Sequence, residues 1–171
     1  MGELVIMKIA ICGKMASGKT TMADWLVNQH GFKKASLAGK VKEIARDLFQ
    51  MKEKDRPLLQ KIGMKMREVR PSVWIDYIID VGDRYEDIVI DDVRFVNEAK
   101  ALHEAGWTVI RLNIDDDLQQ ERLKMTYDNW EVHWNNRHDP SEMEVDQIPD
   151  EYLDLQVDAA FEDYGSLIRV V

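Results

Sequence analysis

Residues 13–20 read Gly13-Lys14-Met15-Ala16-Ser17-Gly18-Lys19-Thr20, a complete match to the phosphate-loop pattern G-x-x-x-x-G-K-[ST]. An apolar run from Met7 to Cys12 precedes the loop, and a helical pattern begins at Thr20. A chance match, with the glycines as ordinary turn residues, is the alternative. It is the weaker one, because the strand–loop–helix order is the setting that the pattern requires. The sequence therefore predicts a loop that binds a nucleoside triphosphate.

The chemistry of such a loop suggests what each residue does. Glycines let the backbone curl until successive N–H groups point at a phosphate, at the positive end of the following helix. Lys19 would reach the β- and γ-phosphates, and the Thr20 hydroxyl would bind Mg²⁺. We therefore expect ATP as the phosphoryl donor and Mg²⁺ as cofactor. The expected donor contacts come from Gly13, Lys14, Met15, Ala16, Ser17, Gly18, Lys19, Thr20 and Thr21.

The composition is that of a single globular domain. A chain of 171 residues, 45% hydrophobic and 32% charged, can bury one core. The net charge of −9 and the lack of a basic stripe argue against binding to long nucleic acids. No apolar run is long enough to span a membrane, and the N-terminus does not read as a signal peptide. The single cysteine, Cys12, suits a cytoplasmic protein, and we expect it to be a small buried side chain.

Apolar stretches and helical patterns alternate along the chain. Strands are expected at about residues 5–12, 88–90, 107–112 and 153–160, and a short apolar stretch at 35–38 leads into a helix. The helix after the loop should end near His30, with Gly31 as its cap. This alternation predicts a three-layer α/β/α P-loop NTPase fold with a parallel five-stranded sheet between helices.

Two helices before residue 82 carry apolar side chains at helical spacing. The first presents Val41, Ile44, Ala45 and Leu48 on one face. The second begins at Pro57 and presents Leu59, Ile62, Met66 and Val69. Arg70-Pro71 should end it, because the residue before a proline avoids the helical conformation.

Residues 115–150 are polar and aromatic with weak periodicity, which favours a mobile lid over a part of the layered core. Arg122, Lys124 and Arg137 could fold over a transferring phosphoryl group and exclude water, although surface charges are the alternative. Trp130 and Trp134 are expected to pack together. The scattered histidines have no zinc-ligand spacing.

Asp91 and Asp92 follow the apolar run 88–90. In parallel sheets, ligands bind outside the carboxyl ends of the strands, so we expect Asp91 or Asp92 to orient Mg²⁺ through water. Capping of the turn into the next helix is the alternative.

Arginines are the informative residues for a second phosphate, because the guanidinium group grips phosphate with paired hydrogen bonds. Arg94 lies at the active edge of the predicted sheet, and Arg67 and Arg70 lie at the end of a helix. Solvated helix ends are the alternative for the latter two, and we expect Arg46 and Arg84 to be surface residues.

Four stretches together resemble the bacteriophage deoxynucleoside monophosphate kinases. They are 38–44, 58–63 followed by Arg67 and Trp74, 92–99 (Asp-Val-Arg-Phe-Val-Asn-Glu-Ala) and 138–142 (His-Asp-Pro-Ser-Glu). The likeness spans roughly residues 7–165. The histidine stretch carries one extra residue, and the asparagine expected near Ala159 is missing. The resemblance implies that Lys42, Gln60, Arg67, Trp74 and Arg94 bind the acceptor nucleotide.

These observations predict one P-loop kinase domain over residues 1–171, with a monophosphate-binding region at about 38–82 and a lid at about 115–150. The expected reaction is transfer of the ATP γ-phosphoryl group to a (deoxy)nucleoside monophosphate, with Lys19, Arg94, Arg122 and Asp92 as the catalytic groups. The alternatives are a kinase of another phosphorylated metabolite, such as phosphomevalonate, and a nucleotide-binding module without catalysis. We expect small nucleotides as partners and the cytoplasm as location, the host's if the gene belongs to a phage. A homodimer is kept as one option for its assembly.

Overall fold

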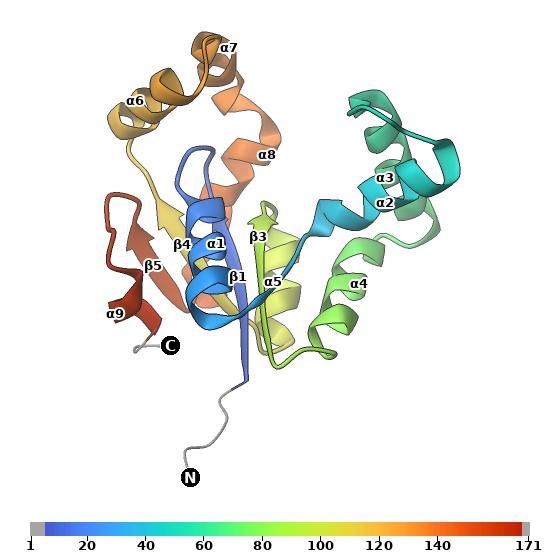
Figure 1. The fold of residues 1–171 in the computed structure, drawn as a ribbon, viewed down its shortest axis with the longest axis horizontal. Coiled ribbons are helices and arrows are strands. Elements are labelled where there is room, and N and C mark those ends of the chain that lie inside the picture. The colour runs from blue at the N-terminus through green and yellow to red at the C-terminus, as the bar shows by residue number, and fades with distance from the viewer. Residues whose placement is uncertain (1–5, 169–171) are drawn as a thin grey trace.

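The computed structural model describes residues 6–168 (Figure 1), so the predicted start of the first strand at Val5 lies outside the described residues. Five parallel strands form one sheet in the order β2-β3-β1-β4-β5. Their bounds are β1 Met7–Gly13, β2 Lys33–Ala35, β3 Asp87–Val93, β4 Thr108–Asn113 and β5 Leu155–Asp158. The predicted parallel five-stranded sheet is therefore confirmed.

Helices surround this sheet. Within residues 6–168 they are α1 Lys19–His30, α2 Leu37–Phe49, α3 Arg56–Val69, α4 Val73–Gly82, α5 Val96–Glu104, α6 Asp116–Thr126, α7 Trp130–Asn135, α8 Pro140–Met143 and α9 Tyr164–Ile168. Three short 3-10 turns, η1 Asn136–His138, η2 Glu144–Gln147 and η3 Asp150–Tyr152, complete the chain between α7 and β5. Within the described residues, no helix is both long and apolar enough to cross a bilayer.

The core lies on both faces of the sheet, as the continuous apolar strands predict. Successive side chains of β3 alternate between faces: Ile88 and Ile90 pack with α4 and α5, whereas Val89 packs on the opposite face with α1. All three side chains are fully buried. The sandwich thereby fixes the carboxyl ends of β1, β3 and β4 beside one another, where the loop after β1 begins.

The α2–α3 pair extends away from the sheet (Figure 1), and the apolar faces of the two helices are only partly covered. Leu48 is 74% exposed and Val69 is 84% exposed, although both continue an apolar stripe. Elsewhere on these stripes Ala45 and Ile62 are buried, and Val41, Ile44 and Met66 pack partly buried against the core.

The segment 115–150 is largely helical, and its last part packs into the core. Val145 and Ile148 are almost completely buried there beside α5, within the region predicted as a lid. Val145 and Ile148 lie in and directly after a short 3-10 turn, so their positions in the sequence show no helical periodicity. What extends beyond the carboxyl ends of the strands is α6, α7 and α8, on the opposite side from α2 and α3 (Figure 1).

Candidate active site

The loop after β1 has the backbone that a phosphate cradle requires. Gly13 and Gly18 have positive φ angles of 154° and 94°. A Cβ at Gly13 would lie 2.6 Å from Ser17 Oγ and 2.8 Å from the Leu112 carbonyl oxygen, so only glycine fits there. Ser17 Oγ is buried and has no hydrogen-bond partner within the described residues. This unpaired hydroxyl and the glycine-lined curl fit a bound phosphate chain.

Lys19 points back over the loop. Its ammonium group donates to the carbonyl oxygens of Gly13 at 2.7 Å and Lys14 at 2.9 Å. Burial lowers the pKa of Lys19 below its ordinary value, and the Glu142 carboxylate opposes this effect. The Lys19 ammonium is therefore held at the loop, where the sequence predicts that it binds the donor phosphates.

Glu142 contacts the loop directly, and the sequence did not assign it to the site. Its Oε2 accepts a hydrogen bond from the Met15 N–H at 2.7 Å, and its Oε1 lies 4.0 Å from Arg94 Nη1. Only 14% of its side chain is exposed. The Glu142 carboxylate thus accepts the Met15 N–H, a donor that a phosphate oxygen in the loop would otherwise use.

Gln119 and Asp146 hold the loop from the same side of the site. Gln119 Nε2 donates to the Met15 carbonyl oxygen at 2.8 Å, and Asp146 pairs with Lys14 at 3.0 Å. Gln119 is fully buried, which indicates a structural contact. The sequence did not predict this contact, because Gln119 is a polar residue in a segment without clear helical periodicity. Together with Glu142, these two residues tie the segment from α6 to η2 to the loop.

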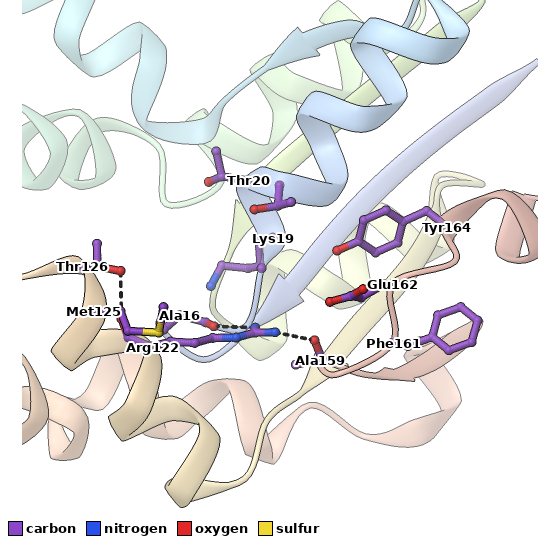
Figure 2. Close-up of a pocket in the computed structure, with 12 residues that line it drawn as sticks. Ala16, Lys19, Thr20, Arg122, Met125, Thr126, Ala159, Phe161, Glu162 and Tyr164 are labelled. Carbon is purple, nitrogen blue, oxygen red and sulfur yellow. Dashed lines mark hydrogen bonds between the residues drawn. The ribbon is translucent and has the colours of Figure 1, made fainter.

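Arg122 is the predicted lid cation that reaches the loop. Its guanidinium donates to the Ala16 carbonyl at 3.0 Å and to the Ala159 carbonyl, after β5, at 2.7 Å (Figure 2). Lys124 instead lies over the Trp130 ring and Arg137 over the Trp134 ring, at 4.6 and 4.0 Å from the ring centres. Each tryptophan therefore has a cation against its face.

A cavity of about 620 Å³ opens beside the loop, between α6 and the segment after β5 (Figure 2). It is lined by Ala16, Gly18, Lys19, Thr20, Thr21, Arg122, Met125, Thr126, Ala159, Phe161, Glu162 and Tyr164. A Cβ at Gly18 would point between Arg122 and Tyr164, at 3.7 Å from the guanidinium and 3.9 Å from the hydroxyl. The volume suits a nucleoside attached to phosphates in the loop.

The Asp92 carboxylate contacts the start of α2. It accepts hydrogen bonds from Ser36 Oγ at 2.7 Å and from the N–H groups of Leu37 and Ala38 at 3.0 Å. Asp92 thereby satisfies three donors at the start of α2 and holds that helix against β3. Its predicted role at Mg²⁺ stays a prediction.

Glu98 caps α5. Its Oε2 accepts from the N–H groups of Arg94 at 3.0 Å and Phe95 at 3.2 Å. Burial raises the pKa of Glu98, and the two backbone hydrogen bonds oppose that rise. Because Glu98 fixes the backbone at residue 94, it sets where the Arg94 side chain begins.

Asp91 remains beside the loop. It pairs with Lys34 of β2 at 3.1 Å, and 12% of its side chain is exposed. Cys12, on β1, is fully buried, and burial raises the pKa of its thiol to about 11, as expected for a packing residue. Among residues 6–168 no group of three or more histidine, cysteine or acidic side chains forms a metal site.

The predicted acceptor residues lie on the α2–α3 side. Lys42 is half-buried on α2, and Gln60 and Arg67 are exposed on α3. Trp74 is only 6% exposed, and its indole N–H donates to the Gly63 carbonyl at 3.2 Å. This hydrogen bond joins α4 to α3, and substrate binding by Trp74 stays a prediction. Arg70 pairs with Asp76 at 2.7 Å.

Solved kinase structures share this fold. A shikimate kinase from Bacteroides thetaiotaomicron superposes with a TM-score of 0.58 at 13% identity, over 96% of each chain. A gluconokinase from Sinorhizobium meliloti gives 0.53 at 14% identity, over 96% of this chain and 91% of that chain. At these identities the similarity concerns the fold alone.

Sequence comparison gives two further similarities. A protein of Acanthamoeba polyphaga mimivirus named "Putative deoxynucleotide monophosphate kinase" is 27% identical, over 61% of this chain and 72% of that protein. A family model described as "AAA domain" matches residues 9–139. Because that match covers most of the sequence, the chain belongs to this AAA domain family, in which it has the fold of a P-loop kinase.

Proposed function

We propose that this chain transfers the γ-phosphoryl group of ATP to a nucleoside or deoxynucleoside monophosphate and so forms the diphosphate. The observation that carries the proposal is the placement of Arg94. Its guanidinium lies 4.0 Å from a carboxylate that is itself hydrogen-bonded to the loop amide of Met15. A second cation beside a triphosphate loop is what a kinase needs when its acceptor is already phosphorylated.

On the donor side, the loop and Lys19 bind the phosphates, and the cavity beside Arg122 and Tyr164 takes the nucleoside. Thr20 and, through water, Asp91 would hold Mg²⁺, which neutralises charge on the donor phosphates when it is bound. Arg122, already hydrogen-bonded to the Ala16 carbonyl, needs only a change of partner to face the γ-phosphate.

On the acceptor side, Arg94 binds the monophosphate, and Lys42, Gln60 and Arg67 bind the rest of the nucleotide. An acceptor phosphate oxygen is an anionic nucleophile, so no general base is required. Residues 38–82 would form the monophosphate-binding region and 116–143 the lid, within one kinase domain. Asp92 then acts indirectly, by fixing the first turn of α2 against β3.

The nucleotide substrate is inferred from the resemblance to bacteriophage deoxynucleoside monophosphate kinases, above all residues 92–99. The name of the mimivirus protein supports the same substrate class. The shikimate kinase and gluconokinase neighbours support the kinase fold and leave the acceptor to experiment.

Steady-state kinetics with ATP, Mg²⁺ and each ribo- and deoxynucleoside monophosphate tests this proposal. Arg94→Ala should lower kcat/KM by about 10²–10³-fold, the usual loss for one group that stabilises transition-state charge. Arg46→Ala, an exposed arginine on α2, is the matched control. Turnover of another phosphorylated metabolite and of no nucleotide would overturn the choice of acceptor. ATP binding without transfer to any acceptor would favour a non-catalytic module.

A further inference from the structure

A second cavity, of about 580 Å³, lies along the free edge of β2, between α2 and α4. Its lining includes four cationic side chains, Lys33, Lys34, Lys40 and Arg84, and two aromatic ones, Tyr77 and Tyr85. None of these residues lines the cavity beside the phosphate loop. The lining also includes the Glu43 carboxylate, so the cavity carries a net positive charge in a chain of net charge −9.

This cavity is distinct from the proposed acceptor site. Lys40 lines it, whereas Lys42, the predicted acceptor contact, does not. Two residues along an α-helix are about 200° apart around its axis, so the two lysines leave α2 in nearly opposite directions. The body of α2 therefore separates the second cavity from the acceptor side of the molecule.

The cations and rings are arranged in pairs. Lys33 Nζ lies 5.6 Å from the centre of the Tyr85 ring, and Lys40 Nζ lies 5.6 Å from that of Tyr77. Lys40 also pairs with Glu43, and Arg84 pairs with Asp80. Ammonium and guanidinium groups bind phosphate, and aromatic rings stack on flat heterocycles.

We propose that this cavity is a second binding site, for a nucleoside phosphate, and that its occupant modulates the site at the loop. The phosphates would be bound by Lys33, Lys34 and Arg84, and the base would lie against Tyr77 or Tyr85. Binding itself is independent of the proposed kinase function; the modulation of turnover rests on it.

Lys34 connects the two sites. Its ammonium bridges Asp24 of α1 at 2.7 Å and Asp91 of β3 at 3.1 Å, while its side chain lines the second cavity. After burial and the nearer charges, Asp91 is among the groups that act on the pKa of Lys19. A phosphate that recruits Lys34 would compete with Asp91 and free this carboxylate beside the loop.

Tyrosine resonances distinguish the two sites, since Tyr77 and Tyr85 line the second cavity and Tyr164 lines the first. The full chain, labelled with ¹³C-tyrosine, is titrated with ATP, with dTTP and with inorganic pyrophosphate while NMR follows each ring. We expect saturable shifts at Tyr77 and Tyr85 with a nucleoside triphosphate. The double variant Lys33→Ala/Arg84→Ala should weaken them at least tenfold, while Tyr164 still shifts with ATP. Lys100→Ala, on α5, is the control.

Three outcomes would overturn the proposal. Tyr77 and Tyr85 could fail to shift, or could shift equally in the double variant, so that the cavity is not the site. Pyrophosphate could match the nucleotides, which would mean an adventitious ion only. A kinetic readout then tests the coupling: kcat/KM for ATP should change at least threefold when the second site fills, and only in the wild type. Tyr164 shifts without any turnover would instead refute the proposed function and leave the second site standing.

Discussion

Glu142→Gln should tighten ATP binding about tenfold. In the structure the Glu142 carboxylate accepts the Met15 N–H at 2.7 Å, and its other oxygen faces Arg94. A triphosphate in the loop would need that N–H and would meet a negative charge at the same place. Glutamine keeps the shape and the acceptor oxygen of the side chain and removes its charge.

The magnitude follows from the contact itself. A hydrogen bond to a charged group contributes about 1.5–3 kcal/mol net, against about 0.5–1.5 kcal/mol for a neutral one. The change from carboxylate to amide should therefore weaken the contact that ATP displaces by roughly 1.4 kcal/mol, which is a factor of about ten in Kd. The pairing with Arg94 adds little, because the Arg94 side chain is 49% exposed and the ions are 4.0 Å apart.

Isothermal titration calorimetry with ATP, without acceptor, measures this effect. Glu131→Gln, an exposed acid on α7, removes the same charge from the same segment and should leave Kd unchanged. The reasoning also sets a pH trend. Because Glu142 opposes the lowering of the Lys19 pKa, the variant should lose ATP affinity at a lower alkaline pH than the wild type. An unchanged or weaker affinity of Glu142→Gln near neutral pH would refute the competition between carboxylate and phosphate.

Four further predictions concern stability and reactivity. Burial raises the pKa of Glu98 in the folded state. Protonated Glu98 therefore contributes to stability at pH values below its unfolded-state pKa, and this contribution is lost as the pH rises through its folded-state pKa. Urea unfolding should therefore show Glu98→Gln gaining stability relative to wild type from pH 4 to pH 7, and a constant difference would contradict this. With a thiol pKa of about 11, buried Cys12 should resist iodoacetamide at pH 8 until the chain is denatured, as followed by mass spectrometry. In thermal melts Gly82→Ala should cost about 1–3 kcal/mol, because its Cβ would overlap the buried Trp107 indole. Gly63→Ala, with its nearest neighbour 3.9 Å away, should instead stabilise α3 by about 0.5–1 kcal/mol.

Local signals predicted the fold well. The apolar run at 88–90, the caps such as Gly31 and the break at Arg70 act within a few residues, so the sequence carries them directly. Amphipathic stripes are less informative at their ends. Leu48 and Val69 continue the apolar faces of α2 and α3, but a stripe shows which side of a helix is apolar and not whether another layer covers it.

The site was predictable where geometry follows from the strand order. The carboxyl end of β3 had to lie beside the loop, and Arg94 does contribute to the electrostatics of Lys19. The partners of a carboxylate at that edge did not follow in the same way. Asp92 accepts hydrogen bonds from the first turn of α2, which begins 55 residues earlier in the chain. Nothing near α2 in the sequence indicates that a carboxylate so far along the chain would bind its first turn.

Met15 shows why the lid contacts could not be read from sequence and why they matter. Its N–H is bound by Glu142, 127 residues away, and its carbonyl oxygen by Gln119, 104 residues away. Both partners belong to the segment that extends beyond the sheet, so the tip of the loop is held on two sides by the same cover. A phosphate that takes the N–H must displace Glu142 and α8, while the Gln119 contact can persist. If the loop binds a donor as proposed, α8 should therefore move on donor binding while α6 stays in place.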